Sequence, residues 1–161
     1  MFARPFIDSL DFALHGKELR GSVAISELSR LADLLAAPVG EMAFLLRGYA
    51  LRDGEPMLAL EVHGSCRLIC QRCLDALEYP VALTSQLKLQ SGEVDEFSDD
   101  GEEFDTIAAD RHLDVVGLIE EELLLALPIS PRHAEGECRV AAVEGESQRN
   151  PFAVLATLKK S

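Results

Sequence analysis

Apolar and polar side chains alternate most clearly over residues 56–70. Successive side chains of a β-strand point to opposite faces, so this pattern predicts a strand with one buried face. The pattern resumes over residues 76–90 and is also present over residues 41–52, which together predict an antiparallel sheet. In the clearest strand, one parity carries Leu58, Leu60, Val62, Cys66, Leu68 and Cys70, and the other carries Glu61, His63, Ser65 and Arg67.

Two segments have helical spacing and a capping residue. Ser26 can cap a helix over about residues 27–36, where leucines form one stripe. Asp114 can cap a helix over residues 114–126, which two prolines follow. The fold class we expect is α+β: an antiparallel sheet of several strands with two or three packed helices and an acidic loop.

The C-terminal part is expected to be less regular. Residues 129–149 are polar and contain glycine, which predicts an irregular loop. Asn150 and Pro151 are typical of the start of a helix and predict a closing helix over residues 152–158. The length of 161 residues fits a single domain that spans residues 1–161.

The chain is strongly acidic, with a formal net charge of −13. Eight acidic residues lie between positions 93 and 105, which predicts a flexible acidic linker. A chain with this charge is poorly suited to coating nucleic acid, because phosphate binding depends on lysine and arginine. No apolar run approaches the roughly 18 residues that span a bilayer, and the N-terminal residues do not resemble a signal peptide. We therefore expect a cytoplasmic protein with reduced cysteines.

Three of the four cysteines and one histidine suggest a metal site. Cys70 and Cys73 have the spacing of a metal-binding knuckle at a strand turn, although Leu74 stands where glycine is usual. His133 and Cys138 lie about 60 residues further on, and the four together could bind one Zn²⁺. Two other interpretations stay open: two reduced cysteines near a turn with one separate loop thiol, or a disulfide.

Cys66 is expected to be a buried, unliganded core residue, because it shares the apolar parity of its strand. The sequence contains no glycine-rich phosphate loop, nucleophile elbow or paired-histidine metalloprotease motif. Arg72 beside Cys73 could activate that thiol, but no local base accompanies it. We therefore expect a protein that is not an enzyme.

Three ordered motifs resemble the YceD family of large ribosomal RNA subunit accumulation proteins. They are Cys70-Gln-Arg-Cys73-Leu74, Glu121-Glu122-Leu-Leu-Leu-Ala-Leu-Pro128 and Asn150-Pro-Phe-Ala-Val-Leu155. The resemblance covers about 110 residues, from the strand before Cys66 to the C-terminus. It implies a non-enzymatic bacterial protein that supports accumulation or processing of large-subunit (23S) ribosomal RNA, and it supplies no catalytic residue.

Two functional hypotheses follow. The first is a ribosome-biogenesis factor that binds a precursor RNA–protein complex, or its protein components, with Arg72, Lys159 and Lys160 as contact residues. The alternative is a metal-binding or thiol redox protein that uses Cys70 and Cys73. The negative charge favours a ribonucleoprotein particle or a basic ribosomal protein over naked RNA as the partner.

Overall fold

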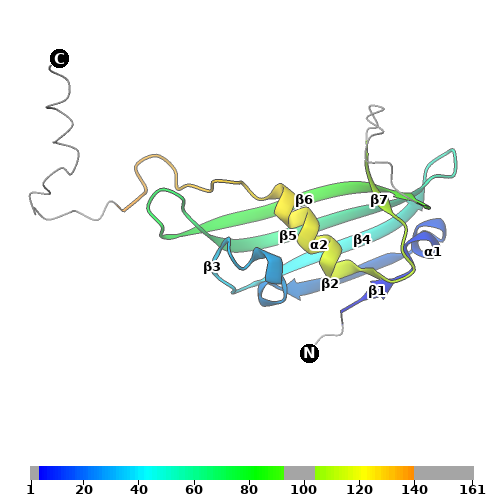
Figure 1. The fold of residues 1–161 in the computed structure, drawn as a ribbon, viewed down its shortest axis with the longest axis horizontal. Coiled ribbons are helices and arrows are strands. Elements are labelled where there is room, and N and C mark those ends of the chain that lie inside the picture. Colours follow the sequence, from blue (N-terminus) through cyan, green and yellow to red (C-terminus); the bar gives the residue numbers. More distant parts are fainter. Residues whose placement is uncertain (1–3, 93–103, 140–161) are drawn as a thin grey trace, which may run out of the picture.

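The computed structural model describes residues 4–92 and 104–139 (Figure 1). Helices and strands follow one another as β1 (Phe6–Ile7), α1 (Ser9–Leu14), β2 (Glu18–Ala24), the 3₁₀ turns η1 (Ile25–Glu27) and η2 (Ser29–Leu31), β3 (Leu35–Ala37), β4 (Glu41–Ala50), β5 (Pro56–Ile69), β6 (Ala76–Gln90), β7 (Asp105–Ala108), β8 (Leu113–Asp114) and α2 (Val115–Ala126).

A six-stranded sheet dominates the architecture, with the order β2-β4-β5-β6-β7 and with β3 paired to β5 beyond the end of β4. Its long strands β4, β5 and β6 are antiparallel neighbours, which confirms the predicted sheet. The parallel pairing of β7 with β6 was not predicted. A separate two-stranded ribbon pairs β1 with β8.

The long hairpin of β5 and β6 sets the place of the candidate site. Its ladder runs from Met57 opposite Lys88 to Ile69 opposite Ala76, so residues 70–75 form the connecting turn. The predicted parity is confirmed, because alternate residues of β5 are buried in the core. Cys66 is 2% exposed, and burial raises the pKa of its thiol.

Helix α2 lies across one face of the sheet near β5 and β6 (Figure 1). It begins where the sequence predicts, because the Asp114 carboxylate accepts a hydrogen bond of 3.1 Å from the backbone N–H of Val116. The apolar side chains that α2 buries against the sheet are Val115, Val116, Leu118, Ile119 and Leu123.

The helix expected over residues 27–36 is not formed. The segment instead makes η1 and η2, which Leu28 separates with ψ of 75°, and it ends in β3. The buried Glu120 accepts a hydrogen bond of 2.6 Å from the backbone N–H of Arg30 and so supports η2 from α2. The apolar stripe is still buried, at Leu28, Leu31 and Leu35, because tight turns and a short strand place it on the core as effectively as a helix would.

The N-terminal helix α1 was not predicted. Asp8 caps it by accepting a hydrogen bond from the N–H of Asp11, and its buried Phe12 and Ala13 pack on β4. At this contact Gly48 has no room for a side chain, since a Cβ there would lie 2.2 Å from the Phe12 carbonyl oxygen. The close approach of the helix backbone to the sheet therefore requires glycine.

Several expectations concern residues outside the described ranges. These are the closing helix over residues 152–158, most of the acidic segment 93–105, and the contact residues Lys159 and Lys160. At the end of that acidic segment, Asp105 begins strand β7 instead of ending a linker. In the described part of the chain, no helix is long and apolar enough to cross a bilayer.

Candidate metal centre

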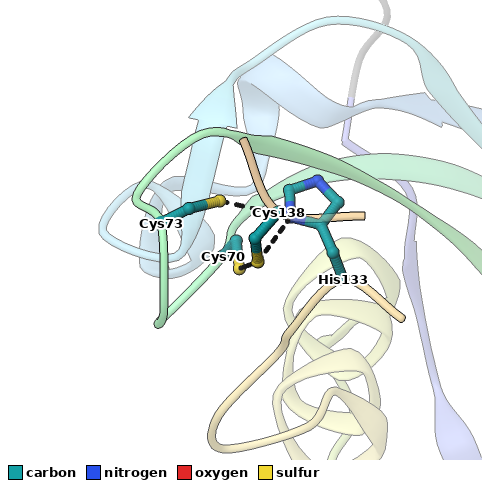
Figure 2. A group of neighbouring side chains, drawn as sticks. All are labelled: Cys70, Cys73, His133 and Cys138. Carbon is teal, nitrogen blue, oxygen red and sulfur yellow. Dashed lines mark hydrogen bonds between the residues drawn. The ribbon is translucent and has the colours of Figure 1, made fainter. Parts of the chain in front are cut away.

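Two distant segments bring four potential metal ligands together (Figure 2). Cys70 directly follows β5, and Cys73 lies in the turn before β6. His133 and Cys138 lie in the segment after α2. One ligand atom from each residue lies within 4.8 Å of all the others, and within residues 4–92 and 104–139 no other group of metal-ligating side chains is gathered in this way.

The first pair is held by a tight turn at the end of the long hairpin. The N–H of Leu74 donates to the Cys70 carbonyl, and the N–H of Cys70 donates to the Asp75 carbonyl, each over 2.9 Å. Leu74 has φ of 64°, a left-handed conformation that favours glycine. The turn therefore has the backbone shape of a metal-binding knuckle although a leucine occupies the position.

The second pair sits in a short stretch without helix or strand. The N–H of Glu137 donates to the Ala134 carbonyl over 3.1 Å, which forms a turn between His133 and Cys138. The two segments are joined by the N–H of Gln71, which donates to the Pro131 carbonyl over 2.8 Å. This backbone link, which the sequence does not reveal, fixes the second pair against the first.

Three of the separations between ligand atoms are close to those around a tetrahedral ion. The Sγ atoms of Cys70 and Cys138 are 3.8 Å apart. The Nδ1 atom of His133 lies 3.3 Å from Cys73 Sγ and 3.7 Å from Cys138 Sγ. Zn–S bonds of about 2.3 Å and Zn–N bonds of about 2.0–2.1 Å at tetrahedral angles require about 3.8 Å between sulfurs and about 3.6 Å between sulfur and nitrogen. The four residues could thus hold one metal ion.

A hydrogen bond orients the imidazole toward the sulfurs. His133 Nε2 lies 3.1 Å from the carbonyl oxygen of Ala76, the first residue of β6. We assign the proton to Nε2, because the carbonyl can only accept, and this leaves the Nδ1 lone pair directed at the thiols. Metal-bound histidines are usually held by such a partner for the second nitrogen. The partner is a backbone group, which is why no side-chain pattern indicated it.

The local electrostatics favour thiolates. Burial raises the pKa of the Cys70 thiol, but hydrogen bonds from backbone groups, first that of Cys73, outweigh it and lower the pKa to about 5. Hydrogen bonds with Cys138 and Cys70 raise the pKa of His133. The backbone of Asp75 lowers the pKa of Cys73, but burial and hydrogen bonds with the other two thiols raise it on balance. At least one ligand is therefore ionised near neutral pH, as metal binding requires.

Arg72 lies against this cluster. Its Nε atom donates to Cys138 Sγ over 3.0 Å, and its Nη2 atom donates to the carbonyls of His133 and Ala134, each over 3.2 Å. The side chain is nevertheless exposed at its outer surface. The sequence placed Arg72 in an exposed turn but could not show these contacts, because their partners are more than 60 residues away.

The arrangement suits a structural site better than a catalytic one. Cys70 is fully buried, and the other three ligands are half-buried. Four protein ligands complete a tetrahedral ion, whereas catalytic zinc sites keep one position for water or substrate. An ion bound here would join the hairpin turn to the segment after α2.

Comparison with known proteins agrees with the sequence motifs. A curated protein of Haemophilus influenzae, "Large ribosomal RNA subunit accumulation protein YceD", is 28% identical over 96% of this chain and 94% of its own length. No solved structure matches the chain. The profile of the family described as "Large ribosomal RNA subunit accumulation protein YceD" matches residues 58–159, which include all four ligands, and the chain therefore belongs to the YceD family.

Proposed function

We propose that this protein is a non-enzymatic ribosome-biogenesis factor that supports accumulation or processing of large-subunit ribosomal RNA in the cytoplasm. The observation that carries the proposal is the family match over residues 58–159, since the family description names accumulation of the large ribosomal RNA subunit. The Haemophilus influenzae relative carries the same name and aligns over nearly the whole of both chains.

The proposed mode of action is binding to a precursor RNA–protein complex or to its protein components. A chain with a net charge of −13 can neutralise few phosphates, so its affinity for naked RNA should be weak and sensitive to salt. A basic ribosomal protein is a more suitable partner, because the acidic residues of segment 93–105 attract basic surfaces. The contact residues we propose are Arg72, Lys159 and Lys160.

The ion we propose for the metal centre is Zn²⁺, with Cys70, Cys73, His133 and Cys138 as ligands. Three thiolates and one imidazole in tetrahedral array are typical of structural zinc. When bound, zinc would supply a cross-link between the hairpin turn and the segment after α2. Elemental analysis of protein purified without chelator should then give close to one zinc per chain.

The functional proposal can be tested in a deletion strain by measuring large-subunit ribosomal RNA. Charge reversal at Lys159 and Lys160 should lower the RNA level without unfolding the protein, and Arg72→Glu is measured separately because Arg72 also contacts the metal centre. Arg52→Glu, in the hairpin turn between β4 and β5, is the matched control. Full restoration by a folded variant with all three contact charges reversed would show that the surface is wrong. Restoration of normal RNA levels by the empty vector would overturn the proposed function.

Co-purification identifies the partner. Tagged protein should recover large-subunit precursors or ribosomal proteins, and treatment with nuclease decides between them. Proteins that remain bound after nuclease support a protein contact, whereas loss of all partners would show that RNA mediates the association.

The second candidate function is thiol redox chemistry at Cys70 and Cys73. The lowered pKa of Cys70 favours it, but reactive cysteines are usually accessible and Cys70 is fully buried. The double variant Cys70→Ser, Cys73→Ser separates the two ideas. Loss of folding stability supports a structural centre, whereas a stable fold that has lost only a thiol activity supports redox chemistry.

A further inference from the structure

The guanidinium group of Arg72 connects the two halves of the metal centre. Arg72 itself lies between the ligands Cys70 and Cys73, yet its hydrogen bonds go to the other ligand pair. They reach Cys138 Sγ over 3.0 Å and the carbonyls of His133 and Ala134 over 3.2 Å. The fork of donors therefore spans the segment between the last two ligands, a geometry that a lysine ammonium could not match.

The net charge of the proposed centre favours a positively charged group beside it. Zn²⁺ bound by three thiolates and a neutral imidazole carries one net negative charge, which a neighbouring guanidinium balances. A hydrogen bond from a charged donor withdraws electron density from the sulfur and is stronger than a neutral one. Among the described residues, Arg72 forms no salt bridge with a carboxylate that would compete for this charge.

We propose that Arg72 is a positioning residue of the metal centre, which neutralises the Zn²⁺–thiolate charge at Cys138 and fixes the His133–Cys138 segment on the hairpin turn. This inference rests on the proposed zinc site. Its consequence is selective: Arg72 protects the sulfur of Cys138 from electrophiles and not those of Cys70 and Cys73, because only Cys138 accepts the guanidinium hydrogen bond.

The test uses the full-length zinc-loaded protein with Arg72→Gln, Arg72→Lys and the control Arg67→Gln. Arg67 is an exposed arginine on β5, opposite Glu78 of β6 and away from the ligands. Two quantities are measured: zinc release to a colorimetric chelator, and the alkylation rate of each cysteine by iodoacetamide followed by mass spectrometry. Circular dichroism establishes that each variant is folded.

We expect Arg72→Gln to lower the affinity for zinc, measured as release to the chelator, about tenfold or more. Substitution of a residue that hydrogen-bonds to a metal ligand commonly has an effect of this size. Cys138 should become the fastest-alkylated ligand, Arg72→Lys should restore part of the protection, and Arg67→Gln should behave as wild type. A general loss of folding would instead expose all four cysteines, including the core residue Cys66. If Arg72→Gln does not fold, Arg72→Lys is compared with wild type instead. Cys138 should then be alkylated faster in Arg72→Lys than in wild type, because lysine restores only part of the protection.

The two proposals fail in different ways. Wild-type protein that binds no zinc would overturn the metal centre and the role of Arg72 in it. Wild-type protein with one zinc, together with unchanged zinc release and unchanged Cys138 alkylation in folded Arg72→Gln, would overturn the role of Arg72 alone.

Discussion

His133 directs its Nε2 atom to the backbone carbonyl of Ala76, 3.1 Å away, and thereby joins the segment after α2 to the first residue of β6. The same ring presents Nδ1 to Cys73 Sγ at 3.3 Å. One side chain thus connects the end of the sheet with the proposed metal ligands, so substitution of His133 should reveal whether its importance is metal binding or packing.

His133→Ala should lose zinc, because three thiolates remain without their fourth ligand. His133→Cys should keep zinc in a four-cysteine site even though it loses the hydrogen bond to Ala76. Zinc content and thermal stability with and without chelator are the measurements, and His112→Ala, at an exposed position, is the control. Equal zinc content in wild type and His133→Ala would remove His133 from the ligand set.

Cys66 should behave as a core residue. Cys66→Ala removes one buried sulfur and should lower the free energy of unfolding by about 1 kcal/mol. Cys66→Ser should cost more, because the buried hydroxyl would lack a partner in the apolar core. Urea unfolding measures both variants. Rapid labelling of Cys66 by a thiol reagent in the native protein would contradict its burial.

Leu74 should carry backbone strain that glycine relieves. Its φ of 64° costs an L-residue roughly 1–2 kcal/mol, which glycine would not incur. Part of the stability that glycine gains in this way is offset by its larger conformational entropy in the unfolded chain. Leu74→Gly should therefore be more stable than Leu74→Ala by up to about 1 kcal/mol. The alanine variant is the matched control, because it also removes the exposed side chain but keeps the strain. Equal stability of the two variants would argue against the left-handed turn.

The metal-free protein should lose the stabilising contribution of Cys70 as the pH falls. The pKa of this thiol is about 5 in the folded protein against an ordinary value of 9.0. A lowered pKa means that the ionised form stabilises the fold at high pH, and that this contribution declines below pH 9.0 and is lost below about 5.

The difference in unfolding free energy between wild type and Cys70→Ser reports the ionisation of Cys70 together with its interactions with His133 and Cys73, because the titrating groups outside the cluster are common to both proteins. Urea unfolding in chelator and reductant should show the difference narrowing from pH 8 to roughly pH 5. A difference that is constant or widens on acidification would show that the pKa of Cys70 is not lowered.

Local patterns in the sequence determined the parts of the fold that depend on neighbours along the chain. Alternation over residues 56–70 and 76–90 predicted β5 and β6 and buried Cys66, because the period of two follows from strand geometry alone. Asp114 predicted the start of α2 for a similar reason, since a helix cap is a contact between residues two or three positions apart. The family motifs likewise predicted membership of the YceD family from the sequence alone.

Tertiary structure decided everything that depends on distant segments. The leucine stripe of residues 27–36 suits a helix, but packing on the sheet and the carboxylate of Glu120 select two 3₁₀ turns and a strand. Cys138 reaches Cys70 across 68 residues, and Arg72 turns toward that sulfur. No local pattern encodes these contacts, because the free energy of closing a long loop is recovered only when both segments pack on the same end of the sheet.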